Sequence, residues 1–161
     1  DLALSGDFIV GFPGETDIDF AQTLRLVTEI EYAQAYSFKY SPRPGTPAAT
    51  AESQVSEPVK AERLAGLQQL LGEQQAAFNR RSVGRTVPVL FDRAGRRPGQ
   101  LHGRTPHMQS VHVEAPPRLA GTIADVTITA AFANSLTGSV VMAGAATGED
   151  PPTRPTREAR A

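Results

Sequence analysis

The spacing of apolar residues changes at Gly84, and this change divides the chain into two parts with different expected folds. Before Gly84, two long segments repeat apolar residues at helical intervals. After it come short stretches of strand-forming residues, separated by turn residues: Val87–Phe91, Gln100–Gly103, Ser110–Glu114, Gly121–Ile128 and Ser139–Met142. Short strands at such regular spacing predict a small antiparallel β-barrel.

The part before Gly84 predicts an α/β arrangement. Asp7–Phe12 is an apolar run that favours a strand buried on both faces, and Ala35–Tyr40 favours a second strand. Between them, Thr16 and Asp19 have the spacing of a capping box, which predicts the start of a helix. A further helix is expected over Glu57–Arg81. A strand, a helix and a strand in this order predict a βαβ unit with parallel strands.

The formal net charge of −1 hides two segments of opposite sign. Residues 1–78 carry 11 acidic and five basic side chains, a net charge of −6. Residues 79–144 carry three acidic and eight basic side chains, a net charge of +5, and every basic one is arginine. This asymmetry indicates that the two parts have different partners.

Seven arginines within residues 80–104 are the strongest functional feature that the residues themselves provide. Arginine pairs with phosphate and stacks on bases, and small β-barrels commonly bind RNA, although a solvated basic face is the alternative. Phe91 is the only aromatic residue in this segment, which favours contact with the RNA backbone over base reading. The candidate RNA-binding residues are Arg80, Arg81, Arg85, Arg93, Arg96, Arg97 and Arg104.

Two loops follow the expected strands and are candidates for binding a small ligand. Phe12–Thr16 joins a strand to a helix, the place where α/β folds bind ligands. Ser41–Pro47 is stiffened by three prolines and could hold backbone atoms against a flat ligand such as a nucleobase. A tight turn and a plain surface crossover are the respective alternatives.

Other features exclude whole classes of chemistry for the residues of this chain. It has no cysteine, and therefore no disulfide, thiolate nucleophile or cysteine-held iron–sulfur cluster. His102, His107 and His112 do not have compact metal-ligand spacing, and we expect them to be scattered surface residues. No apolar run approaches the roughly 20 residues of a membrane span. The tail from Ala145 is rich in proline and is expected to be disordered.

Four stretches together resemble the radical-SAM tRNA methylthiotransferases of the MiaB type. They are Asp7–Thr16, Ala35–Ala48, Gly99–Thr105 and Ser110–Pro116, the last two resembling the TRAM domain of that family. The resemblance implies the C-terminal part of a partial TIM-like α/β barrel over residues 1–82. An antiparallel, OB-like TRAM β-barrel over 83–144 and a disordered tail over 145–161 would follow. Gln109 stands where we expect asparagine, which puts a base contact at that position in doubt.

The resemblance also implies an activity: addition of a methylthio group to C2 of an N6-isopentenylated adenosine beside the tRNA anticodon. S-adenosylmethionine and two [4Fe–4S] clusters would be the cofactors and tRNA the partner, for a cytoplasmic, monomeric protein without a membrane association. By family role, the residues near S-adenosylmethionine would be Ile9, Gly11, Phe12, Pro13, Glu15, Phe38, Tyr40 and Ser41.

The missing cysteines are the main departure from the family pattern. They indicate an N-terminally truncated piece that is inactive alone and contains no catalytic or metal-binding residue of its own. Two alternatives remain open. The family member could act on N6-threonylcarbamoyladenosine in tRNA, or the chain could be a non-enzymatic RNA-binding adaptor.

Overall fold

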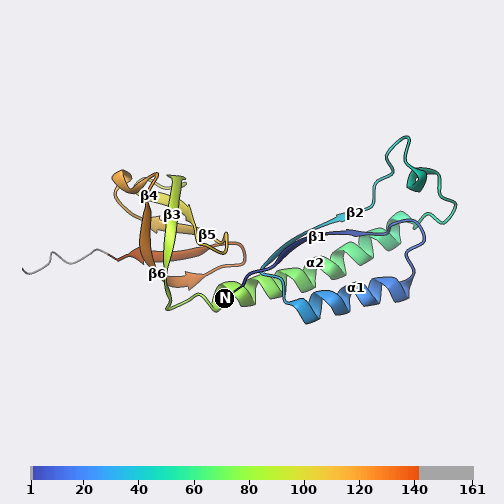
Figure 1. Cartoon of the computed structure of the whole chain (residues 1–161), viewed down its shortest axis with the longest axis horizontal. Helices are drawn as coiled ribbons and strands as arrows, with labels where there is room; N and C mark the ends of the chain where they lie inside the picture. Colours follow the sequence, from blue (N-terminus) through green and yellow to red (C-terminus); the bar gives the residue numbers. More distant parts are fainter. Residues whose placement is uncertain (1, 142–161) are drawn as a thin grey trace, which may run out of the picture.

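The computed structural model describes residues 2–141, which form an α/β part followed by a β-barrel (Figure 1). The tail expected to be disordered, residues 145–161, and Met142 lie outside the described residues. The α/β part consists of β1 (Ser5–Val10), α1 (Asp17–Ile30), β2 (Gln34–Lys39), a short 3₁₀ helix (Pro47–Thr50) and α2 (Glu57–Arg80).

β1 and β2 pair in parallel, as the strand–helix–strand order predicted, with Ser5 opposite Gln34. The predicted capping box is also present at the start of α1. The amide of Asp19 donates to Oγ1 of Thr16 at 3.2 Å, and the amide of Thr16 donates to Oδ2 of Asp19 at 2.9 Å. Two amide groups that the helix itself cannot satisfy thus have partners, which fixes where the helix begins.

The prediction that the first strand is buried on both faces is wrong for this chain. Val10 packs with Val27, Leu67 and Leu71 in a buried cluster. Ile9, which alternates with Val10 along β1, is 58% exposed. The reason is that both helices lie on the same side of the two strands, so only one face of the sheet is covered (Figure 1).

The second part is a closed barrel with the strand order β3-β4-β5-β7-β6. The strands are β3 (Thr86–Ala94), β4 (Gln100–Arg104), β5 (Ser110–Glu114), β6 (Ile123–Ala131) and β7 (Leu136–Val140). The register shifts between Phe91 and Arg93 in β3, and again between Ile128 and Ala130 in β6. Such bulges bend strands, as a barrel of this size requires.

Two details of the barrel differ from the prediction. β5 and β7 pair in parallel, with Val111 opposite Leu136, so the barrel is not wholly antiparallel. After β5 the chain crosses to pair β6 with β3, and the β6–β7 hairpin then returns β7 along β5 in the same direction. The last strand also begins at Leu136 and not at Ser139, because the buried Leu136 side chain belongs to the core.

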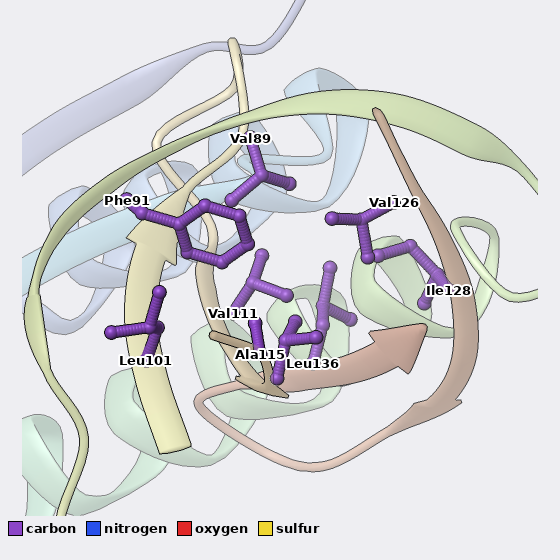
Figure 2. Packing of buried hydrophobic residues seen from close by; sticks show 9 residues of the cluster. Val89, Phe91, Leu101, Val111, Ala115, Val126, Ile128 and Leu136 are labelled. Atoms are coloured by element: carbon purple, nitrogen blue, oxygen red, sulfur yellow. The ribbon is translucent and has the colours of Figure 1, made fainter. Parts of the chain in front are cut away.

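The barrel core consists of inward-facing side chains from all five strands (Figure 2). Phe91 is fully buried there, so the ring that lay closest in sequence to the arginines cannot contact RNA. At Gly103, an added Cβ would lie 2.6 Å from the carbonyl oxygen of Leu90, so β4 approaches β3 more closely there than a side chain would permit. The buried members are Val89, Phe91, Leu101, Val111, Val113, Ala115, Val126, Ile128 and Leu136.

A hydrogen-bonded joint connects the end of α2 to the barrel. Nδ2 of Asn79 donates to the carbonyl oxygens of Phe132 and Ala133, at 3.0 and 3.1 Å. Nε2 of Gln109 donates to Oδ1 of Asn79 and to Oγ of Ser82, both at 3.0 Å. Asn79 and Ser82 are buried. Gln109 therefore has a structural role in the joint, which accounts for an amide side chain at this position without any contact to a base.

Candidate functional site

A cavity of about 570 Å³ opens at the carboxyl ends of β1 and β2. Its volume is within the range of small-molecule sites. Five of the eight residues predicted to lie near a cofactor line it: Ile9, Phe12, Phe38, Tyr40 and Ser41. The remaining lining residues are Lys39, Arg43, Thr46 and Ala48, so the stiff loop after β2 forms one wall. The structure thus brings the two loops selected from the sequence to one site.

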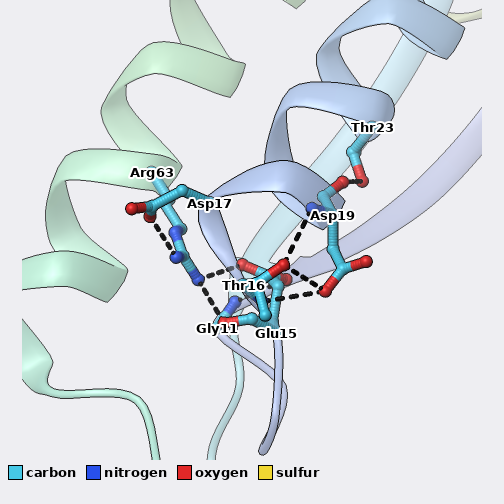
Figure 3. Close-up of polar contacts among 7 residues, drawn as sticks. All are labelled: Gly11, Glu15, Thr16, Asp17, Asp19, Thr23 and Arg63. Carbon is cyan, nitrogen blue, oxygen red and sulfur yellow. Dashed lines mark hydrogen bonds and ion pairs between the residues drawn. The ribbon is translucent and has the colours of Figure 1, made fainter.

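Gly11 and Glu15 do not line the cavity, but they contact each other on either side of Phe12 in the chain (Figure 3). Oε2 of Glu15 accepts a hydrogen bond from the Gly11 amide at 3.0 Å, and Oε1 pairs with Arg63 at 2.7 Å. Both carboxylate oxygens therefore have protein partners. Pro13, the remaining predicted residue, does not line the cavity either.

Two buried cations of α2, Lys60 and Arg63, brace the loops around the cavity. Lys60 is 4% exposed; its Nζ lies 5.4 Å from the centre of the Tyr40 ring and 3.1 Å from Oε1 of Glu57. Arg63 is 6% exposed, and its hydrogen bond to Asp17, then that to Glu15, raise the pKa of its guanidinium. The sequence did not reveal these two residues, because lysine and arginine on a helix usually face solvent.

Gly11 and Tyr40 show how closely this region is packed. Gly11 has a φ of +72°, and a Cβ there would lie 2.4 Å from Cγ of Lys60. The Tyr40 ring contacts that of Phe12 edge-on, with centroids 5.2 Å apart. The Tyr40 hydroxyl is buried and has no hydrogen-bond partner among the described residues. The cavity wall thus contains a polar atom that a bound ligand could satisfy.

The seven candidate RNA-binding arginines do not form one surface. Arg80, Arg81 and Arg85 lie where α2 leads into β3, and Arg81 pairs with Glu31 at 3.2 Å. Nη1 of Arg93 and Nε of Arg104 lie 3.4 and 3.9 Å from Oδ2 of Asp92. Arg96 and Arg97 occupy the turn between β3 and β4.

A groove of about 390 Å³ separates the β3–β4 turn from the β6–β7 turn. It is lined by Arg96, Arg97, Gln100, His112, Phe132, Ser135, Leu136 and Thr137, and we call it the basic groove. Phe132 is 58% exposed, and it places an aromatic ring on the same groove as two of the arginines. The sequence analysis missed Phe132 because it lies some 35 residues after Arg97 and only the barrel topology unites them.

The expectation that the three histidines are scattered at the surface is wrong for His102. His102 is buried, with Nδ1 2.6 Å from Oδ1 of Asp92 and Nε2 2.6 Å from Oγ of Ser110. The bulge in β3 between Phe91 and Arg93 adjoins Asp92, and the His102 hydrogen bond is the main cause of the lowered pKa of that carboxyl. The His112 ring lies 5.1 Å from that of His102, and burial lowers its pKa.

Neither a metal site nor a membrane span emerges from the part of the chain that the structure describes. Among residues 2–141, no three His, Asp or Glu side chains are grouped as metal ligands. Over the same residues, no helix has the length and apolar character needed to cross a membrane.

Comparison with known proteins places both parts of the chain. Residues 80–141 match the TRAM domain family. Three similar proteins are named tRNA-2-methylthio-N(6)-dimethylallyladenosine synthase. That of Maricaulis maris is 59% identical over 140 residues, which are 87% of this chain and 31% of that protein. Those of Sphingopyxis alaskensis and Rickettsia felis are each 58% identical, over 89% and 88% of this chain and 32% of each relative.

The chain thus spans about a third of the length of these relatives. Because the similarity extends over 140 residues or more of a 161-residue chain, it includes residues of both the α/β part and the barrel. The predicted resemblance to the MiaB-type tRNA methylthiotransferases is therefore confirmed at the level of sequence, and residues 80–141 match the TRAM domain family.

Proposed function

We propose that this chain is part of an enzyme that methylthiolates C2 of N6-isopentenyladenosine next to the anticodon of tRNA. The observation that carries the proposal is the 58–59% identity to three proteins whose name describes that product. The cavity and the basic groove give the chain two sites suited to such work, one for a small cofactor and one for RNA.

The residues of the cavity fit S-adenosylmethionine. The aromatic rings that line the cavity, those of Phe12, Phe38 and Tyr40, suit an adenine. The Tyr40 hydroxyl, which has no hydrogen-bond partner among the described residues, suits a polar edge of the ligand. Ile9, Phe12, Phe38, Tyr40 and Ser41 would contact the cofactor, whereas Gly11, Pro13 and Glu15 would hold the loop in shape. S-adenosylmethionine would supply the methyl group of the product.

The two [4Fe–4S] clusters do not fit the residues of this chain. Protein ligands of such clusters are cysteine thiolates, and the chain contains none. Any cluster of the complete enzyme would have to be held by other residues, so we expect this chain to be inactive alone. We assign no step of the reaction to its side chains beyond binding and positioning.

Residues 1–82 would form a portion of a radical-SAM α/β barrel, and residues 83–144 the TRAM β-barrel. In an α/β barrel, helices cover the outer face of the parallel strands and the other face lines the interior. β1 and β2 show this asymmetry, with Val10 buried against the helices and Ile9 and Phe38 exposed on the opposite face. The exposed face would be the barrel interior, where a substrate and a cofactor meet.

The same proposal gives tRNA as the partner of the barrel, with a cytoplasmic, monomeric enzyme as the context. Two alternatives have different consequences. An enzyme acting on N6-threonylcarbamoyladenosine would leave that nucleoside without its methylthio group in a strain lacking the gene. An RNA-binding adaptor would leave every modified nucleoside unchanged, so nucleoside analysis of a deletion strain separates the three cases.

Filter binding of tRNA to this chain tests the RNA-binding part of the proposal. Contacts of arginine with phosphate release counterions, so the association constant should fall steeply with salt, with a log–log slope of about −0.9 for each duplex phosphate neutralised. A slope of about −2 to −4 is expected from the guanidinium groups exposed on the barrel. Absence of binding at low salt, or binding insensitive to salt, would refute this part.

A further inference from the structure

The basic groove differs from the other arginine-bearing surfaces of the barrel because it combines free cations with an exposed ring. Neither Arg96 nor Arg97 has a carboxylate partner among residues 2–141, and no acidic residue lines the groove. Arg93 and Arg104, in contrast, adjoin Asp92. A guanidinium without a carboxylate partner is available to a phosphate, which it can bind through two parallel hydrogen bonds.

The turn that presents Phe132 is held from two sides. The Phe132 amide donates to the carbonyl oxygen of Ser135 at 2.8 Å, which closes the turn between β6 and β7. Asn79 at the end of α2 binds the carbonyl oxygens of Phe132 and Ala133. The backbone is therefore fixed while the ring remains 58% exposed. An aromatic ring held in this way loses little entropy when a base stacks on it.

The opposite wall of the groove is equally well fixed. The amide of Gly95 donates to the carbonyl oxygen of Gln100 at 2.7 Å, and the amide of Gln100 donates to the carbonyl oxygen of Arg97 at 3.1 Å. Gly99 completes this turn with a φ of +77°. The two arginines thus lie on a tight turn that is closed by backbone hydrogen bonds.

The floor of the groove supplies neutral polar groups. His112 and Thr137 lie opposite each other on β5 and β7. The Nδ1 atom of His112 is buried and has no hydrogen-bond partner among the described residues. A polar floor, a cationic wall and an aromatic wall correspond to the three parts of a nucleotide: base edge, phosphate and base face.

We propose that the basic groove binds one unpaired nucleotide of the RNA, with its base on Phe132 and its phosphate on Arg96 and Arg97. A groove of about 390 Å³ has the size of a single small ligand. A base within a duplex is stacked on both faces and cannot reach the ring, so the groove selects single-stranded or looped RNA. This inference rests on the proposed RNA binding. It differs from the expectation that the barrel contacts only the RNA backbone, because it adds recognition of an exposed base.

Phe132→Trp provides a direct test, because the chain contains no tryptophan and the new side chain is a unique fluorophore. The probes are a mixed-sequence RNA octamer and the same octamer in a blunt-ended duplex, titrated into the full 161-residue chain. We expect saturable quenching by the single strand, and at least tenfold weaker quenching by the duplex. Unchanged circular dichroism would show that the variant folds, as the exposure of Phe132 leads us to expect.

Paired variants then locate the phosphate contact. Arg96→Ala with Arg97→Ala should weaken octamer binding at least tenfold in filter binding, and Phe132→Ala should weaken it about as much. The control, Arg25→Ala with Arg118→Ala, removes the same number of exposed arginines outside the groove and should cost less than threefold. Filter binding of Phe132→Ala does not need the tryptophan signal, so the role of Phe132 can be tested even if Phe132→Trp does not fold.

The outcomes separate this inference from the proposed function. If the octamer and tRNA bind but the groove and control variants lose affinity equally, RNA binding stands and the groove assignment is overturned. Equal quenching by the duplex would overturn the preference for an unpaired base. If no RNA binds at low salt, the proposed RNA-binding function itself fails.

Discussion

Replacement of Arg63 by methionine tests whether one buried cation holds the loop beside the cavity. Arg63 reaches from α2 to the β1–α1 loop, where it donates to the carbonyl oxygen of Glu15 at 3.1 Å and to its carboxylate at 2.7 Å (Figure 3). Methionine retains an apolar stem that can pack near Phe20. The variant therefore removes the charge and its hydrogen bonds while it fills much of the same space.

The expected loss follows from the burial of the two partners. Removing one member of a buried ion pair costs about 3–5 kcal/mol, because the other charge remains buried without a partner. The Glu15 side chain is 13% exposed, so we expect the lower end, a loss of about 3 kcal/mol in the free energy of unfolding. The second ion pair, to Asp17, adds little because the Asp17 side chain is 97% exposed.

Arg25→Met is the matched control, because it makes the same substitution at an exposed ion pair. Arg25 and Glu29 lie one turn apart on α1 with an N–O distance of 2.7 Å, and their side chains are 81% and 59% exposed. Pairs of this kind contribute about 0.3–0.5 kcal/mol. The two variants thus differ in burial and hardly in chemistry.

Urea unfolding followed by circular dichroism at 222 nm measures both losses. The two α-helices of residues 2–141 belong to the α/β part, so the helical signal reports on that part. With a slope of about 1.5 kcal/mol per molar urea, Arg63→Met should lower the midpoint by about 2 M, and Arg25→Met by about 0.3 M. Equal shifts would refute the reasoning, and adding Glu15→Gln to Arg63→Met should recover part of the loss because it removes the unpaired charge.

Three further predictions concern the barrel and α2. Gly103→Ala should lower the free energy of unfolding of the barrel by about 1–3 kcal/mol in thermal denaturation, because its Cβ would lie 2.6 Å from the Leu90 oxygen. Gly72→Ala should raise the stability of α2 by roughly 0.5–1 kcal/mol, because nothing lies within 4 Å of the new methyl group and alanine favours helix. The pKa of His112 is lowered in the folded state by its burial, so below about pH 6.5 the unfolded chain binds more protons than the folded one. The free energy of unfolding therefore decreases as the pH is lowered through this range. Melting temperatures at pH 7.5 and 5.5 should therefore differ less for His112→Asn than for the parent chain.

The secondary structure follows largely from local patterns. Thr16 and Asp19 marked the start of α1, and the strand-forming runs marked all five barrel strands, the last of them about three residues late. The parallel pairing of Val111 with Leu136 could not be predicted in this way. Alternation along a strand shows which face is buried but contains no information about which strand lies beside it.

The candidate sites show the same division between local and long-range information. The loops that line the cavity were recognisable because each follows a strand directly, and parallel strands bring such loops together. Arg63 and Phe132 had no local mark, since each becomes functional only by contact with a distant segment. His102 was misjudged for the same reason, because Asp92 and Ser110 contact it only in the folded barrel.

The placement of the two sites constrains how one RNA could use both. The cavity lies at the carboxyl end of β1, whereas the barrel adjoins its amino end, where Leu4 and Met108 line a common cavity. Six residues of strand separate these ends, a length of about 20 Å. Under the proposed function, an RNA held in the basic groove must therefore extend by at least this distance before its reacting base reaches the cofactor. The hydrogen bonds of Asn79 and Gln109 hold the end of α2 to the barrel, so under the proposed function the shape of the RNA would contribute to determining which nucleotide arrives there.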